Sequence, residues 1–345
     1  MSSSEIPVID ISNPSPEVAQ QVLSAACTHG FLFIANDGVT IPPANIDAMF
    51  NLSKSFFSSP TPTKQAFSIH TPAAGGINRG WVRMEGEALD PSGTEKGDAK
   101  EAFNIGPPFP SLQPLPDPLA ASAALIKTFQ TSCHALCVQI LSLLATGLEI
   151  ADRDYFTQRH DQSKGPSGTI FRMLYYPPSS KSTSPSSSSP SGKKVDVRAG
   201  AHSDYGTVTL LFRLPGQAGL ELLTPAGTWV PVPVNPAPET LCTPPILVNI
   251  GDLLCYWTDG MLKSTVHRVA FSGGEEQERY SMAYFCHPLD EVRLEAVESE
   301  VVRRGADREE LGRQRERLGI GREDAGVVIT AKEHLERRLK VTYGL

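Results

Sequence analysis

The second half of the chain consists of short apolar runs separated by glycine, proline and polar residues. The runs are Ile170–Tyr176, Thr207–Phe212, Gly219–Leu223, Ile246–Ile250 and Tyr280–Cys286. Each is short for a helix but long enough for a strand, and many short strands at this spacing are typical of an all-β sandwich or barrel. The pattern therefore restricts this half of the chain to a mainly β fold.

The rest of the chain adds helices around this β region. We expect a strand at Ile6–Asp10, a helix from Ser15 to Gly30, a strand at Phe31–Ile34, and helices at Pro43–Phe57, Pro118–Leu148 and Thr330–Val341. Proline after a serine cap and glycine at the other end are typical helix boundaries. We predict an N-terminal α/β region over residues 1–115, a long helix and connection over 116–165, a β core over 166–290, and a charged, helical C-terminal region over 291–345.

One segment of the predicted core has a different composition. Residues 178–194 are dominated by serine, proline and lysine, with too little apolar content to pack. Such a composition predicts a disordered surface insert between two strands.

Composition limits the possible partners. The chain has 345 residues, 40% of them hydrophobic, and a formal net charge of −7. Because no basic field attracts phosphate, we expect no nucleic-acid partner. We also expect no membrane partner, because no uninterrupted apolar run reaches the length of a span.

The six cysteines include no Cys-x-x-Cys pair, and the first residues do not resemble a signal peptide. Both features predict a cytoplasmic protein with reduced thiols, and the oligomeric state is left open.

The residues that carry chemistry begin with His202-Ser-Asp204 and continue much later with His267. On an extended strand, side chains two residues apart point to the same side, so His202 and Asp204 would lie together. A neighbouring strand could add His267. Two imidazoles and one carboxylate on one face of a metal are the ligand set of non-haem Fe(II) oxygenases, which keep other coordination positions open.

A second pair, Arg279-Tyr-Ser281, follows on the strand after His267. The two side chains share a strand face, and an arginine fork with a hydroxyl suits two-pronged binding of a carboxylate. The metal site and the carboxylate clamp together indicate a functional site more strongly than either motif alone.

Several motifs together resemble those of the 2-oxoglutarate and Fe(II)-dependent dioxygenases of the isopenicillin N synthase-like group. The similar stretches are Ile6–Ile11, Gly30–Gly38, Asp98–Phe103, Ile105–Gly106, His202–Leu211, Val248–Asp252, Thr265–Val269 and Arg279–Ser281. The resemblance implies a double-stranded β-helix, or jelly-roll, with flanking helices. This fold agrees with the strand pattern read from the sequence itself.

The resemblance also implies roles for individual residues. His202, Asp204 and His267 would bind iron and form the catalytic centre. Arg279 and Ser281 would hold the distal carboxylate of 2-oxoglutarate, and Tyr176 matches a tyrosine that adds a hydroxyl to that carboxylate in many members. Leu174 departs from the pattern, because many plant members have asparagine there and leucine cannot donate a hydrogen bond to the cosubstrate.

Candidates for substrate contacts rest on weaker signals. Phe285 shares strand parity with Arg279 and Ser281, so we expect its ring in the same cavity. Arg79 lies in a glycine-rich segment that could cap the cavity, and Phe103 and Phe212 are further apolar candidates. Core packing or a surface ion pair remains the alternative role for each of the four.

The predicted function is Fe(II)- and 2-oxoglutarate-dependent oxidation of a small organic molecule by O2, hydroxylating or desaturating it in secondary or catabolic metabolism, with release of succinate and CO2. One alternative is an Fe(II) oxidase of the same group that does not use 2-oxoglutarate. Another is a non-catalytic small-molecule binding protein on the same scaffold. Neither the substrate nor the choice between hydroxylation, desaturation, demethylation and ring formation is contained in these motifs.

Overall fold

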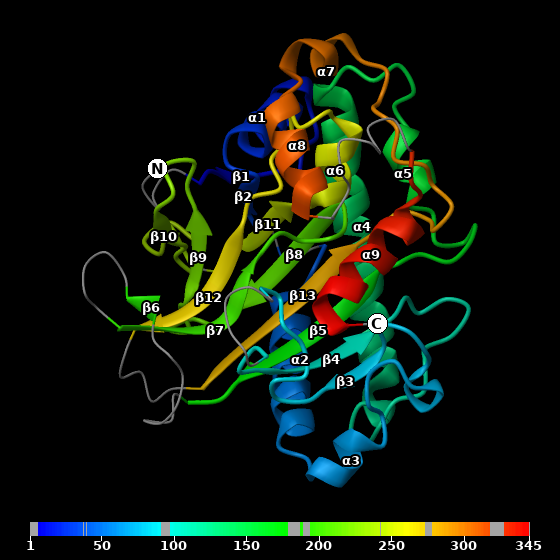
Figure 1. The fold of residues 1–345 in the computed structure, drawn as a ribbon, viewed down its shortest axis with the longest axis vertical. Coiled ribbons are helices and arrows are strands. Elements are labelled where there is room, and N and C mark those ends of the chain that lie inside the picture. The colour runs from blue at the N-terminus through cyan, green and yellow to red at the C-terminus, as the bar shows by residue number, and fades with distance from the viewer. Residues whose placement is uncertain are drawn as a thin grey trace.

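The computed structural model describes residues 6–36, 38, 40–90, 97–178, 187–188, 194–241, 243–272, 278–317 and 328–344. Within these ranges the strands form two sheets, which cross the middle of the molecule in Figure 1. Helices α1, α6, α7 and α8 gather at one end of the view, and α9 lies close to the C-terminus.

The larger sheet has eight strands in the order β1-β2-β11-β8-β13-β5-β4-β3. Their bounds are β1 Val8–Ile9, β2 Phe31–Ile34, β3 Gly80–Val82, β4 Glu101–Ile105, β5 Ile170–Tyr176, β8 Val208–Arg213, β11 Ile246–Ile250 and β13 Arg279–Cys286. Apart from the parallel pair β1–β2, neighbouring strands run antiparallel. The N-terminal strands thus extend the sheet that the second half of the chain builds.

The smaller sheet has five strands in the order β10-β9-β12-β7-β6. They are β6 Ser187–Ser188, β7 Lys194–His202, β9 Leu220–Leu223, β10 Trp229–Pro231 and β12 His267–Ser272. Two packed, mainly antiparallel sheets with helices outside them confirm the predicted jelly-roll with flanking helices.

The helices lie outside the two sheets, and α2 and α4 both pack on β13 of the larger sheet. They are α1 Pro16–Thr28, α2 Pro43–Phe57, α3 Thr61–Gln65, η2 Pro72–Ala74, η3 Ala120–Ser122, α4 Ala123–Gly147, α5 Tyr155–Arg159, α6 Asp252–Trp257, α7 Glu300–Gly305, α8 Arg308–Arg317 and α9 Ala331–Tyr343. The main apolar core lies between these helices and the sheet, where Phe129 of α4 packs against Phe171 and Phe212.

The predicted serine cap at the start of α1 is confirmed. The Ser15 hydroxyl accepts a hydrogen bond from the Val18 N–H at the start of α1, and α2 has the predicted bounds. Thr330 caps α9 in a capping box with Glu333, which satisfies N–H groups that the first turn leaves unpaired.

One helix is long and apolar enough on average to span a membrane, although no uninterrupted apolar run in the chain reaches that length. Helix Ala120–Gly147 meets that criterion by length and composition, with a mean hydropathy of 1.2 over its most apolar window. The sequence reading required an uninterrupted apolar run, whereas mean hydropathy tolerates interspersed polar residues. In the structure 56% of the window is buried inside the protein, as is usual for the central helix of a folded domain.

Two other predictions can be compared with the structure only over the described residues. The predicted insert over 178–194 lies mostly outside the described residues, and Ser187–Ser188 within it pair with the start of β7. The described cysteines are Cys27, Cys133, Cys137, Cys255 and Cys286, and all five are free thiols. The prediction of reduced thiols is therefore confirmed for these five.

Candidate active site

The fold brings His202, Asp204 and His267 to one point between the two sheets. His202 is the last residue of β7 and His267 is the first residue of β12, and the two are paired directly in the antiparallel register. Asp204 lies in a turn just beyond the end of β7. Its backbone carbonyl accepts a hydrogen bond from the Asp252 N–H. The carboxylate therefore reaches the histidines from a turn, not from the continuous strand that the sequence predicted.

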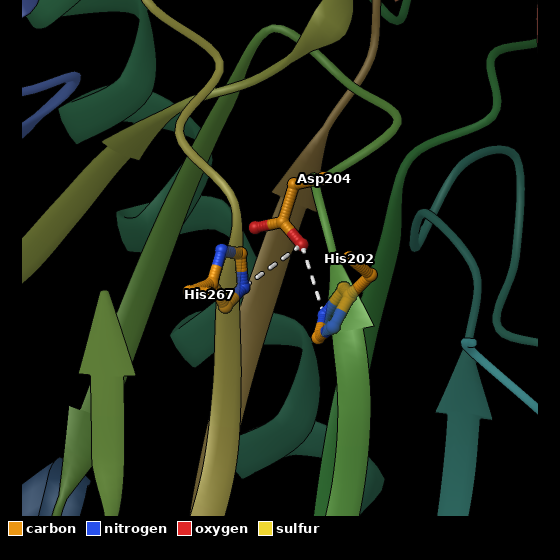
Figure 2. A group of neighbouring side chains, drawn as sticks. All are labelled: His202, Asp204 and His267. Atoms are coloured by element: carbon orange, nitrogen blue, oxygen red, sulfur yellow. Dashed lines mark ion pairs between the residues drawn. The ribbon is translucent and has the colours of Figure 1, made fainter. Parts of the chain in front are cut away.

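Figure 2 shows the three side chains converging, with the Asp204 carboxylate between the two imidazoles. Asp204 Oδ1 lies 3.8 Å from His202 Nε2 and 3.6 Å from His267 Nε2. One donor atom from each of the three residues lies within 4.8 Å of the others. Donor atoms at this spacing can ligate one ion together.

The backbone orients both imidazoles. His202 Nδ1 lies 2.7 Å from the Gly200 carbonyl oxygen, and His267 Nδ1 lies 3.1 Å from the Thr265 carbonyl oxygen. A carbonyl only accepts, so each Nδ1 carries the proton and each Nε2 presents a lone pair to the centre. Phe31 of β2 packs edge-on against the His267 ring at 5.6 Å and limits its rotation.

The Asp204 carboxylate is fixed in position and held ionised. Asn249 of β11 donates a hydrogen bond of 2.6 Å from Nδ2 to Asp204 Oδ2, which leaves Oδ1 directed toward the imidazoles. Burial works to raise the pKa of Asp204, but His267, His202 and the Asn249 amide hold it below its usual value. Burial, together with the neighbouring His267, lowers the pKa of His202 to about 3.

This donor set fits Fe(II). Two neutral imidazoles and one carboxylate occupy one side of a divalent ion, and hydrogen bonds from a neighbouring amide and to backbone carbonyls fix the ligands from behind. Among the described residues, no other group of three His, Cys, Asp or Glu side chains has this spacing.

The second predicted pair lies on the strand facing the same cavity. Arg279 and Ser281 of β13 are 3% and 2% exposed, and Arg279 Nη1 donates to Ser281 Oγ at 3.2 Å. Arg279 Nε donates to the Ala218 carbonyl at 2.9 Å, and the guanidinium lies 4.9 Å from the Tyr176 ring centre. In the described part of the chain no carboxylate forms an ion pair with Arg279, so a buried cation is available to an anionic ligand.

A second arginine next to this pair was missed in the sequence. Arg213 of β8 is paired with Ser281 in the sheet register and is 7% exposed. It donates to the Val232 and Pro233 carbonyls, and burial with the nearby Arg279 lowers its pKa to about 9. Arg213 does not line the cavity, but its positive charge next to Arg279 makes this end of the cavity more attractive to a carboxylate.

One cavity of about 110 Å³ contains the triad and the arginine end. It is lined by His202, Asp204, His267, Arg279, Ser281 and Tyr176, and Leu174 forms part of its apolar wall. The departure at Leu174 thus places a side chain without hydrogen-bonding groups in the wall of this cavity.

Of the four predicted substrate-contact residues, one lines the cavity and three do not. Phe285 lines the cavity, as predicted. Phe103 and Phe212 do not, because they point to the helix side of the larger sheet, where Phe103 packs on Phe56 and Phe212 on Phe129. Arg79 is not part of the lining either, since its guanidinium packs against Gly106.

Other lining residues escaped the sequence reading. They include Glu87, Lys100, Arg172, Tyr205, Asn249, Leu335, Leu339, Thr342 and Tyr343. Arg172 could have been found, because it shares strand parity with Tyr176. The residues of α9 carried no local signal, since only the tertiary fold brings that helix over the cavity.

Comparison with known proteins agrees with this geometry. Residues 167–288 match the model of the 2OG-Fe(II) oxygenase superfamily, and residues 6–125 match the N-terminal model of a non-haem dioxygenase in morphine synthesis. The chain belongs to the 2OG-Fe(II) oxygenase superfamily. This oxygenase is 33% identical to a UPF0676 protein of Schizosaccharomyces pombe, over 100% of this chain and 94% of that protein.

Two further relatives are a named 2-oxoglutarate-dependent dioxygenase and a protein solved with 2-oxoglutarate bound. The 2-oxoglutarate-dependent dioxygenase gloF of Glarea lozoyensis is 30% identical over 76% of this chain and 79% of its own. A full-length Neurospora crassa protein, solved in complex with 2-oxoglutarate and thymine, is 27% identical, with a TM-score of 0.71, and the match covers 97% of this chain and 96% of that one. The oxygenase is thus an oxidoreductase that uses Fe(II), 2-oxoglutarate and O2, as predicted.

Proposed function

We propose that His202, Asp204 and His267 bind the Fe(II) of this oxygenase, and that Arg279 and Ser281 bind the distal carboxylate of its 2-oxoglutarate. The observation that carries the proposal is one cavity that joins three converging donor atoms to a buried arginine without a described carboxylate partner. Tyr176 supports the guanidinium through its ring face.

The protein's own residues hold and orient the reactants. The Nδ1 hydrogen bonds of both histidines fix the ligand faces, and Asn249 fixes the Asp204 carboxylate. Bound iron would supply the centre at which O2 is activated while 2-oxoglutarate is converted to succinate and CO2. Leu174, Leu211, Val269 and Phe285 give the cavity apolar walls that restrict water near the reacting groups.

The substrate is a small organic molecule that enters the same cavity. Support comes from the limited volume of the cavity and from the Neurospora crassa structures, which contain thymine or 5-formyluracil with 2-oxoglutarate. Those ligands belong to that protein, and they support a ring-sized substrate beside the cosubstrate in a jelly-roll of this shape.

The test is a metabolite-library screen for substrate-stimulated succinate release by purified Fe(II)-loaded protein, followed by mass analysis of the product. We expect one succinate per turnover and a product that gains one oxygen or loses two hydrogens. Oxidation of a substrate without succinate formation would favour the oxidase alternative.

A ligand variant tests the metal assignment. We expect His267→Ala to abolish turnover and to weaken iron binding strongly in an anaerobic Fe(II) titration. His29→Ala, a change of the same type outside the cavity lining, serves as the matched control. If His267→Ala keeps normal iron affinity and turnover, the triad does not hold the metal; if the wild type binds no Fe(II), the binding-protein alternative replaces the proposal.

A further inference from the structure

The cavity has a second polar end that neither the iron nor the 2-oxoglutarate assignment uses. Ile170, Arg172, Leu174 and Tyr176 of β5 all line it, as expected for alternate residues on one strand face. Tyr176 contacts Arg279 at the cosubstrate end. Arg172 lies four residues away along β5, which at about 3.3 Å per residue separates the two ends by roughly 13 Å.

At this second end, four charged side chains form a closed network. Glu87 accepts from Arg172 and, at 2.8 Å, from Lys100, and Lys100 also contacts Asp98 at 2.5 Å. Tyr343 of α9 donates its hydroxyl to the other Glu87 oxygen. Glu87, Lys100 and Arg172 are 4%, 1% and 8% exposed, so the network is buried in the wall of the cavity.

The charges in this network cancel. Glu87 and Asp98 carry one negative charge each, and Lys100 and Arg172 carry one positive charge each, so the wall has no net charge. One donor nevertheless remains unused, because Arg172 Nε is buried without a hydrogen-bond partner among the described residues. Asn78, whose side chain accepts from Asn104 Nδ2 at 3.0 Å, adds a neutral amide to the same wall.

We propose that this wall binds the substrate, and that the substrate is an uncharged molecule that presents a hydrogen-bond acceptor, such as an amide or lactam carbonyl, to Arg172. The proposal rests on the proposed function and specifies the substrate class of that site. Arg172 is a substrate-binding residue in this assignment, and Glu87 is a positioning residue that neutralises it.

The two ends of the cavity select different ligands for an electrostatic reason. At the cosubstrate end, Arg279 and Arg213 have no described carboxylate partner, so an anion gains a counter-charge there. At the Arg172 end, Glu87 already supplies that counter-charge. A substrate carboxylate would therefore lose its hydration without gaining an unpaired cation, whereas a neutral carbonyl loses much less.

The first experiment needs no variant. Isothermal titration compares matched probes, benzamide against benzoate and δ-valerolactam against valerate, on wild-type protein saturated with 2-oxoglutarate under argon. We expect each neutral probe to bind at least tenfold more tightly than its carboxylate partner. Equal or reversed preference, or failure of both neutral probes to bind, overturns the proposal.

Variants then test the residues. Arg172→Gln should weaken benzamide binding at least tenfold and leave 2-oxoglutarate affinity unchanged. Glu87→Gln should leave a net positive wall and move the preference toward benzoate, a change that a purely structural role would not produce. The control Arg198→Gln removes another buried arginine, paired with Asp196 and absent from the cavity lining, and should change neither affinity.

Failure of this inference can be told apart from failure of the proposed function. If Fe(II) and 2-oxoglutarate bind normally while Arg172→Gln leaves the affinity for benzamide unchanged, only the proposed substrate class is wrong. If the protein binds neither Fe(II) nor 2-oxoglutarate, the proposed function fails, and the preference for neutral probes is then measured by titrating the protein without either ligand.

Discussion

Arg279→Lys tests the cosubstrate site most directly, because it keeps the positive charge and removes the planar fork. In the structure Arg279 uses Nε for the Ala218 carbonyl and one Nη1 proton for Ser281, which leaves its remaining N–H groups for a ligand. A lysine ammonium cannot maintain these contacts and also form a two-pronged bond to a carboxylate.

The expected magnitude follows from the loss of one charge-assisted hydrogen bond. Such a bond contributes about 1.5–3 kcal/mol, which corresponds to a rise of roughly 10- to 150-fold in the dissociation constant of 2-oxoglutarate. Anaerobic calorimetric titration of the Fe(II)-loaded protein with 2-oxoglutarate measures it directly. Iron affinity should stay unchanged, because Arg279 is not one of the three ligand side chains.

The matched control is Arg198→Lys, the same change at another buried arginine that donates to Asp196 and to the Pro177 carbonyl. We expect 2-oxoglutarate to bind this control as it binds the wild type. A rise of less than about threefold in Arg279→Lys, with normal folding, would refute two-pronged binding at this position.

Three further predictions concern the supports of the site. Asn249→Ala releases Asp204 Oδ2 and should weaken Fe(II) binding about 10- to 100-fold in an anaerobic titration, as loss of a hydrogen bond behind a metal ligand generally does. Glu87→Gln should lower the free energy of unfolding by about 3–5 kcal/mol at neutral pH because it breaks a buried ion pair. Burial works to raise the pKa of Glu87, but Arg172 and Lys100 hold that pKa below its ordinary value of 4.5. The stabilisation from the ionised Glu87 should therefore be complete above pH 4.5 and should fade as the pH falls below 4.5. Urea unfolding at a series of pH values measures this change. Gly30→Ala should lower the free energy of unfolding by about 1–3 kcal/mol, because Gly30 has φ +66° and a Cβ would lie 2.1 Å from the Lys263 carbonyl oxygen. Thermal unfolding measures this loss.

The metal-ligand and arginine motifs and the pattern of short strands could be predicted from the sequence, because side chains alternate between the two faces of a strand. Alternation along β13 placed Arg279, Ser281 and Phe285 on one face, and the structure puts all three in the cavity lining. Phe103 and Phe212 were misassigned because an apolar aromatic fits either face of a strand that is buried on both sides. Only the register with neighbouring strands decides which face borders the cavity.

The charged wall could not have been predicted in the same way. Glu87 and Lys100 lie in irregular segments, and Tyr343 lies on a helix far along the chain. No local periodicity connects these residues with Arg172 of β5, since their contacts depend on how loop, strand and C-terminal helix pack together. Arg213 illustrates the same limit, because its proximity to Arg279 arises from cross-strand pairing.

The pairing of β2 with β11 has a consequence for how the protein acquires its metal. Strand β2 carries Phe31 against the His267 ring, and it joins the sheet through residues that are synthesised much later, such as Asn249. Contacts between such distant segments form slowly, because the intervening chain must first be ordered. Iron uptake should therefore be among the last events of refolding, and the recovery of Fe(II) affinity over time would report completion of the barrel.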